Sequence, residues 1–131
     1  MSAGIDHIII TVNNYERACR FYDWLMPQLN YSEGVHDFDG TRGWTAKSAS
    51  FWIKNADTRF VADTFNKDRV GLCEIAFKGE SRAQIDELAK ELEAHGARIL
   101  DPPREYNYAP GYYAVFFTDP DGIKLEVVHV P

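Results

Sequence analysis

The sequence has few cysteines, no excess of positive charge and no long hydrophobic run. Cys19 and Cys73 lie 54 residues apart and form no CxxC pair, so two reduced thiols in a cytoplasmic protein are the simplest interpretation. The net charge of −6 argues against nucleic acid, which requires a basic surface, and weakly against an anionic membrane surface. No apolar segment is long enough to span a bilayer, and the N-terminus lacks the basic-then-apolar pattern of a signal peptide. We therefore expect a cytoplasmic protein without nucleic-acid or membrane partners.

Aromatic residues are the unusually abundant class. The 131 residues suffice for one compact domain, and 14% of them are aromatic, including three Trp and seven Tyr. Such a content fits a surface that lines a ligand or a dimer interface, although a core could also hold most of these rings.

The first half of the chain predicts one strand, one helix and three further strands. Residues 7–12, "HIIITV", are rich in β-branched side chains, which indicates a strand buried on both faces. Apolar residues recur at helical spacing within residues 13–31, with Asn14 as N-cap and with Pro27 and Asn30 limiting the far end. Further strands are predicted at residues 31–38, 43–47 and 50–55.

The second half predicts the same order of elements. Residues 71–79, "GLCEIAFKG", read as a strand, and residues 81–97 as a helix with Ser81 and Gln84 as a capping box and Gly96 as C-cap. Three strands are predicted to follow, at residues 97–103, 112–118 and 123–130, the last two joined by the turn "DPDG".

The two halves match when one is shifted by 67 residues over the other. The shift places His7 on Glu74 and the predicted cap Asn14 on the predicted cap Ser81. The apolar helix positions coincide as well: Ala18 with Ile85, Phe21 with Leu88, and Leu25 with Leu92. We infer a duplicated β-α-β-β-β unit, residues 1–66 and 67–131, which together form one domain. Neither copy covers its own sheet, so the two must pack together within the chain or by exchange across a dimer.

Glu74 is the unexpected residue of "GLCEIAF", because burying an unpaired carboxylate is costly. The duplication makes it the counterpart of His7, on the strand face opposite to Cys73.

Three motifs carry a resemblance to a known family. They are "DPDGIKLE", "DHIIITV" followed by "ERACRFY", and "EIAF" where the family usually has "HIAF". With the duplicated unit, this combination resembles the vicinal oxygen chelate superfamily, which includes glyoxalase I, extradiol dioxygenases and bleomycin-binding proteins. The resemblance implies an α+β fold in which two βαβββ units pair into a cup-shaped, barrel-like curved sheet, the glyoxalase-like fold.

The resemblance also implies a metal site. Each unit of the family supplies ligand positions on its first and last strands, which here gives His7, Glu74 and Glu126. The fourth position falls on Lys54, with Trp52 on the same strand face, so the fourth ligand is missing. One imidazole and two carboxylates suit Zn²⁺, Mn²⁺, Fe²⁺, Ni²⁺ or Mg²⁺ with open positions for substrate. Taken singly, His7 could be a hydrogen-bonded core residue, Glu126 a sheet-edge carboxylate and Glu74 the partner of an arginine.

Aromatic and basic residues near the expected cup are candidates for binding substrate. An aromatic wall with a few polar tips is typical of a small-molecule pocket, although core packing or solvent exposure would explain some of these residues equally well. The candidates are Trp44, Trp52, Lys54, Tyr108, Tyr112, Tyr113 and Arg42.

The resemblance implies a glyoxalase-like, metal-dependent lyase, isomerase or transferase that acts on a small oxygenated metabolite. Glu74 or Glu126 would shuttle a proton while the metal stabilises an enolate or oxyanion. The alternative is a non-catalytic small-molecule binder of the bleomycin-resistance type. An extradiol-type dioxygenase ranks below both, because those enzymes place two His and one Glu around Fe²⁺. Two-unit chains of the family commonly pair, so a homodimer is expected.

Overall fold

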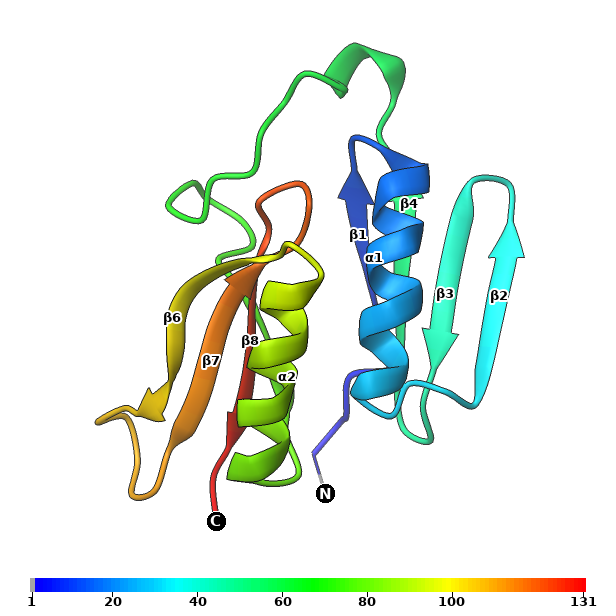
Figure 1. Ribbon diagram of the computed structural model, residues 1–131. Coiled ribbons are helices and arrows are strands. Elements are labelled where there is room, and N and C mark those ends of the chain that lie inside the picture. The colour runs from blue at the N-terminus through cyan, green and yellow to red at the C-terminus, as the bar shows by residue number, and fades with distance from the viewer. Residues whose placement is uncertain (1) are drawn as a thin grey trace. The chain divides into compact units, whose positions relative to one another are not determined.

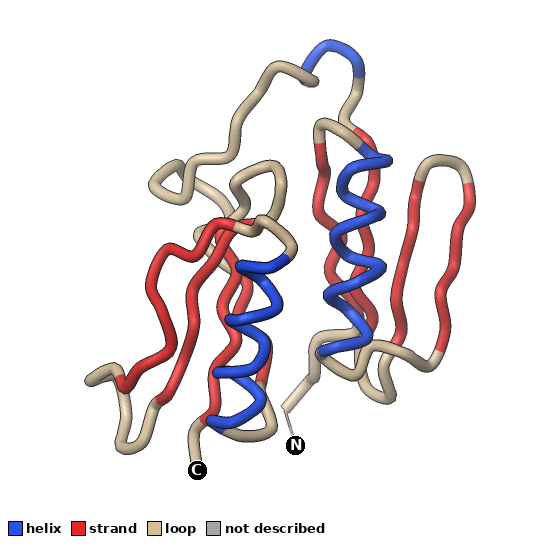
Figure 2. The backbone as a smooth tube through the Cα atoms, viewed as in Figure 1, coloured by secondary structure: helices blue, strands red, loops and turns tan. Residues whose placement is uncertain are grey.

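The computed structural model describes residues 2–131, which fall into two compact units. The first ends at Asp63 and the second spans Thr64–Pro131. Each contains one long helix and one four-stranded sheet (Figure 1; Figure 2). Among the described helices, none combines the length and the apolar character needed to cross a membrane.

The first unit begins with β1 (His7–Val12) and α1 (Tyr15–Gln28). Its sheet has the order β1-β4-β3-β2, in which β1 and β4 are parallel and the other pairs antiparallel. The remaining strands are β2 (Gly34–Phe38), β3 (Thr41–Thr45) and β4 (Ser50–Asn55), followed by the short 3₁₀ helix η1 (Thr58–Phe60).

The second unit repeats this arrangement. It begins with β5 (Ile75–Lys78) and α2 (Arg82–Ala94), and its sheet has the order β5-β8-β7-β6 with β5 and β8 parallel. The other strands are β6 (Arg98–Glu105), β7 (Tyr113–Thr118) and β8 (Lys124–His129). The α+β class and the duplicated βαβββ unit are therefore confirmed.

Both predicted N-caps are confirmed. Oδ1 of Asn14 accepts a hydrogen bond from the backbone N–H of Arg17 at 3.1 Å, and Oγ of Ser81 accepts one from Gln84 at 3.0 Å. At the other end of α2, His95 is the C-cap and Gly96 follows it with φ +77°, so the glycine lies one residue beyond its predicted place.

α1 ends at Gln28, one residue after Pro27, and Asn30 follows with φ +65°, so the predicted end of the helix is confirmed. A proline in the last turn removes only one helical hydrogen bond, and Leu25 and Met26 just before it are fully buried. Their packing holds the last turn in place.

Two strand predictions need correction. β1 is not buried on both faces, because Ile10 and Val12 are buried while Ile9 is 51% exposed. Within its unit α1 covers only one face of the sheet. β5 starts at Ile75 rather than at Gly71, which has a φ of +128° that a β-strand does not allow. Glu74 therefore lies just before the strand.

Each helix packs its apolar stripe on its own sheet. In the first unit Tyr22 contacts Phe51 and Trp44, with ring centroids 5.0 and 5.9 Å apart. In the second unit the fully buried helix residues Ile85 and Leu92 form the corresponding stripe. The strand residues with buried side chains in the second unit are Ile75, Phe77, Val115, Phe117, Leu125 and Val127.

Candidate functional site

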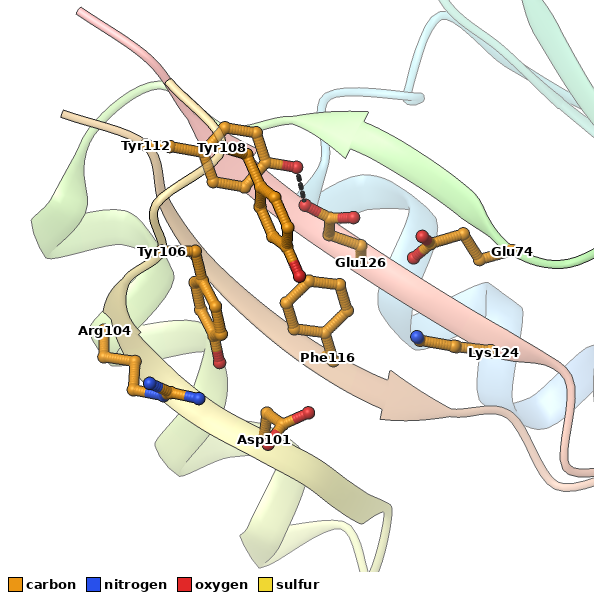
Figure 3. Close-up of a pocket in the computed structure, with 9 residues that line it drawn as sticks. All are labelled: Glu74, Asp101, Arg104, Tyr106, Tyr108, Tyr112, Phe116, Lys124 and Glu126. Atoms are coloured by element: carbon orange, nitrogen blue, oxygen red, sulfur yellow. Dashed lines mark hydrogen bonds between the residues drawn. The ribbon is translucent and has the colours of Figure 1, made fainter. Parts of the chain in front are cut away.

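The second unit carries a pocket of about 440 Å³ on the sheet face opposite to α2 (Figure 3). Strand register selects the residues of this face. Glu126 of β8 pairs with Phe116 of β7 and with Ala76 of β5, whereas its neighbours Leu125 and Val127 point to the buried side. The nine lining residues are Glu74, Asp101, Arg104, Tyr106, Tyr108, Tyr112, Phe116, Lys124 and Glu126.

Glu126 is the buried acid of the pocket, with only 3% of its surface exposed. The hydroxyl of Tyr112 donates a hydrogen bond to its Oε2 (Figure 3). Burial raises the pKa of the Glu126 carboxyl, the Tyr112 hydrogen bond opposes that rise, and the charge of Glu74 adds to it. Burial and the bond to Glu126 likewise raise the pKa of the Tyr112 hydroxyl. Glu126 therefore holds its proton to a higher pH than an exposed glutamate does.

Glu74 faces Glu126 in the same pocket. Figure 3 shows the Glu74 carboxyl directed toward Glu126, whose own carboxyl reaches Tyr112. Oε2 of Glu74 is buried and has no hydrogen-bond partner in the described part of the chain. A buried acceptor without a donor is costly, so this oxygen is a place where a ligand can bind.

Four aromatic rings form a continuous wall. Tyr106 and Tyr108 are stacked, with centroids 5.9 Å apart and an interplanar angle of 5°. Tyr112 meets Tyr108 edge-on at 5.2 Å, and Phe116 meets Tyr106 edge-on at 5.2 Å. Both the stacked pair and the two edge-on pairs are favourable ring arrangements, and they present ring faces and hydroxyl groups to the pocket.

Two basic side chains lie over two rings of this wall, Tyr106 and Phe116. The guanidinium carbon of Arg104 is 4.3 Å from the centroid of Tyr106, and Nζ of Lys124 is 4.9 Å from that of Phe116. Both distances are within the range of cation–π interactions. Lys124 also lowers the pKa of Glu126, against the larger effect of burial.

Four of the predicted site residues therefore line one pocket: Glu74, Glu126, Tyr108 and Tyr112. Three others lie on the first unit, on the sheet face opposite to α1. His7 is exposed, with Nδ1 2.7 Å from Oδ2 of Asp6. Trp52 donates its indole N–H to Oγ of Ser50 at 2.8 Å and stacks with His36, whereas Lys54 is exposed.

The register corrects the predicted fourth ligand position. Ile9 pairs with Trp52 in the first unit, as Ala76 pairs with Glu126 in the second. Because Ala76 is the residue that the 67-residue shift places on Ile9, Trp52 is the counterpart of Glu126, and Lys54 lies two residues beyond it. The fourth position therefore falls on Trp52, whose indole offers no lone pair to a cation.

Three predicted substrate contacts have structural partners instead. Trp44 is fully buried in the first-unit core and donates its indole N–H to Oδ1 of Asp23 at 3.1 Å. Arg42 binds the same carboxylate through Nε at 2.9 Å and reaches Asp37 through Nη1 at 2.9 Å. Tyr113 lies on the α2 side of its sheet, where its hydroxyl donates to Asp86. These side chains are held by their own unit and do not line the pocket.

Five lining residues were missed. Lys124 could have been found, because it lies two residues before Glu126 on the same strand face. Phe116 follows from pairing β7 with β8. Asp101 and Arg104 could not be placed, because β6 shifts register between Ile99 and Asp101 and again across Pro102 and Pro103. Tyr106 follows the end of this strand.

Glu74 and Glu126 have the oxygen donors that a divalent cation prefers, but they are only two of the three predicted ligands. Oε2 of Glu74 is a free buried oxygen beside a second carboxylate, which is the kind of donor that hard cations prefer. Within residues 2–131, however, no three His, Cys, Asp or Glu side chains come together as a group that could hold a metal ion. Glu74 and Glu126 therefore supply two of the predicted ligands, and the predicted third, His7, belongs to the first unit.

Comparison with known proteins assigns the family. Residues 4–127 match the Glyoxalase/Bleomycin resistance protein/Dioxygenase superfamily. The chain belongs to this superfamily. The match covers both βαβββ units, as the duplication requires, and confirms the resemblance seen in the sequence motifs.

Individual related proteins match nearly the whole length of this chain. The uncharacterised protein YqjT of Bacillus subtilis (strain 168) is 34% identical over 123 residues, which cover 93% of this chain and 95% of the relative. A crystal structure of a candidate glyoxalase from Bacillus halodurans has a TM-score of 0.81 at 30% identity, covering 96% of this chain and 95% of that one. A glyoxylase/bleomycin resistance protein/dioxygenase domain from Frankia sp. EAN1pec has a TM-score of 0.77 at 25% identity, with both chains fully covered.

Proposed function

We propose that the protein is a glyoxalase-like enzyme that moves a proton on a carbon atom next to the carbonyl group of a small oxygenated molecule. The observation that carries this proposal is the buried Glu126 carboxyl, which faces an open pocket and accepts a hydrogen bond from Tyr112. A carboxylate with a raised pKa is a stronger base than an exposed one and suits proton transfer near neutral pH.

In the proposed reaction Glu126 acts first as base and then as acid. Its carboxylate takes the proton from the carbon atom, and the electron pair of the broken C–H bond moves to the carbonyl oxygen as an enolate forms. The protonated Glu126 then gives the proton to the former carbonyl carbon, while the hydroxyl proton of the first carbon passes to the enolate oxygen. The result is an isomerised 2-hydroxy carbonyl product, with no oxidant or reductant consumed.

Lys124 supplies positive charge near the enolate oxygen. Its ammonium group lines the pocket over Phe116 and already interacts favourably with the charge of Glu126. In a pocket that is partly shielded from water, such a fixed charge stabilises a developing oxyanion more than it would in bulk solvent. Tyr112 keeps the Glu126 carboxyl in position through its hydrogen bond.

A divalent metal ion remains part of the proposal as a cofactor. Glu74 and Glu126 would hold it, with His7 as the predicted third ligand, and when bound it would add Lewis-acid stabilisation of the enolate. The proton transfer described above uses only the side chains of the pocket. Elemental analysis of protein purified without chelator, before and after titration with Mn²⁺ and Zn²⁺, tests the cofactor separately.

Exchange of carbon-bound hydrogen for deuterium tests the proposed reaction. The protein is incubated in D₂O with a set of small 2-oxo and 2-hydroxy carbonyl compounds, and loss of the C–H signal is followed by proton NMR. We expect exchange for at least one compound, and a loss of about 100-fold or more in Glu126→Gln. Glu93→Gln, which changes an exposed helix residue of the same unit, is the matched control. Exchange that persists in Glu126→Gln at the wild-type rate would contradict the proposal.

A second candidate is a non-catalytic small-molecule binder. The aromatic wall supports this alternative, because stacked and edge-on rings can hold a ligand by contact alone. Compounds that bind the pocket, as seen by tyrosine shifts in NMR spectra, without exchanging any C–H proton would support the binder over the enzyme.

Pairing of the two units into one cup, within the chain or in a homodimer, also stays a proposal. Size-exclusion chromatography with light scattering distinguishes a monomer from a dimer.

A further inference from the structure

In the described chain, one carboxylate oxygen of Glu74 lacks a hydrogen-bond donor. Oε2 of Glu74 is buried and has no partner among residues 2–131, although Tyr112 supplies a donor to the neighbouring Glu126. Of the lining side chains with hydrogens to donate, Lys124 and Arg104 lie over aromatic rings. The hydroxyls of Tyr106 and Tyr112 bind Pro102 and Glu126, and no bond from Tyr108 reaches this oxygen. When Glu126 is ionised, as its role as base requires, a bound molecule is the remaining source of a donor.

The two rings at the Tyr112 end of the aromatic wall carry no cation from the described part of the chain. Arg104 lies over Tyr106 and Lys124 over Phe116, so the other two rings already have one. Over the remaining rings of the pocket, Tyr108 and Tyr112, no Lys or Arg of the described chain is placed. These two meet edge-on with centroids 5.2 Å apart, and Figure 3 shows them on the Glu126 side of the pocket. The negative face of an aromatic ring attracts a positive charge.

The charges of the lining side chains also favour a positively charged ligand. Three carboxyl groups line it, from Glu74, Asp101 and Glu126, against the two cations Arg104 and Lys124. Two carboxylates that face one another repel, and a positive group between them relieves that repulsion. An organic ammonium group satisfies the carboxylate and the ring faces together. A bare metal ion would gain little from the rings, because it binds through oxygen and nitrogen lone pairs.

We propose that the substrate of this pocket carries a protonated amine, which donates an N–H to Oε2 of Glu74 beside the rings of Tyr108 and Tyr112. This inference rests on the proposed function and gives the two acids separate roles. In the metal-free protein Glu74 holds the ammonium group, and Glu126 takes the proton from the neighbouring carbon. The substrate class is thus a small amino-carbonyl compound.

Four probes of similar size separate the contributions. Benzylamine is a cation with N–H donors, benzyltrimethylammonium is a cation without them, benzyl alcohol is neutral and benzoate is an anion. Binding is measured at neutral pH by NMR shifts of the tyrosine rings in the whole protein, in the presence of a chelator. We expect benzylamine to bind about tenfold or more tightly than benzyl alcohol, with benzyltrimethylammonium between them and benzoate weakest.

Variants assign the effect to the named residues. Glu74→Gln should weaken benzylamine about tenfold and leave benzyl alcohol unchanged, and Tyr108→Leu should weaken both cations. Tyr108 is 71% exposed, so its removal does not open a cavity in the core. Glu93→Gln is again the control. Equal binding of benzylamine and benzyl alcohol, or an unchanged affinity in Glu74→Gln, would overturn the inference.

The outcome is separable from that of the proposed function. Amine binding without any deuterium exchange would retain the amine site and reject the enzyme. Exchange on carbonyl compounds that lack an amine, without competition by benzylamine, would retain the enzyme and reject the amine class.

Discussion

The hydroxyl of Tyr112 donates a hydrogen bond to Oε2 of Glu126, and it joins a residue that precedes β7 to a buried acid on β8. This bond favours the ionised form of Glu126, whereas burial and the charge of Glu74 favour the protonated form. The protonation of the candidate base therefore depends on a tyrosine that can be changed without altering the acid itself.

Replacing Tyr112 by Phe should raise the pKa of Glu126 further, because the carboxylate loses its donor. The acidic limb of the exchange reaction should shift to higher pH. NMR titration of protein with ¹³C-labelled glutamate carboxyl groups measures the same change without relying on activity. Tyr113→Phe is the control, since that hydroxyl binds Asp86 on the other side of the sheet. A Glu126 titration that is identical in Tyr112→Phe and the wild type would show that the bond is unimportant.

Glu126 should make the protein less stable as the pH rises. The pKa of its carboxyl is raised in the folded state, so its stabilising effect is present below the pKa of the unfolded chain and is lost as the pH passes the folded value. Relative to Glu126→Gln, which does not titrate, the wild type should therefore have a higher melting temperature at pH 4 than at pH 7. One kcal/mol corresponds to roughly 4 °C for a domain of this size. Melting curves that run parallel across this pH range would exclude the buried charge as the cause.

Gly43 should not tolerate a larger side chain. A Cβ atom at this position would lie 2.2 Å from Cδ2 of Trp52, so the indole that covers the glycine must move. Gly43→Val should cost about 1–3 kcal/mol of unfolding free energy and shift the tryptophan fluorescence, as measured by urea denaturation. Gly4→Ala is the matched control, because nothing lies within 4 Å of its added Cβ. Full stability of Gly43→Val would mean that the ring does not lie where it is placed here.

Asp23 should stabilise the first unit through its two partners, Arg42 and Trp44. Asp23→Asn should lower the unfolding free energy by about 1 kcal/mol, because the site is partly solvent-exposed. High salt should reduce the difference between variant and wild type. Asp57→Asn, which removes an exposed ion pair with Arg59, should leave the denaturation midpoint unchanged. An equal effect of the two substitutions would count against a specific role for Asp23.

Much of the fold could be predicted because its signals are local. Helix caps, apolar spacing and turn residues depend on neighbours a few positions away, and Asn14 and Ser81 begin both helices as expected. The repeat added long-range information, since two copies of one pattern must adopt one topology. The errors occurred where burial or a backbone angle decided, as at Ile9 on the exposed face of β1 and at Gly71 before β5.

The sequence predicted two acids of the site and part of its aromatic wall. Glu74 and Glu126 stand out as carboxylates in apolar surroundings, and two of the tyrosines follow from the aromatic cluster near residue 110. Strand alternation alone could not tell Tyr112 from Tyr113, because the start of β7 decides which of them faces the pocket. Trp44 and Arg42 look equally suited to bind a ligand until their partner Asp23 is seen on the helix.

By itself the sequence determined the α+β class, the duplication, the family and the identity of the two acids, since each depends on patterns along the chain. Only the tertiary structure decided that Trp52 is the counterpart of Glu126, that Tyr112 binds this acid, and that Glu74 keeps an unpaired oxygen. Those facts depend on register between strands and on side chains that meet across the sheet, where a shift of one residue reverses every side chain.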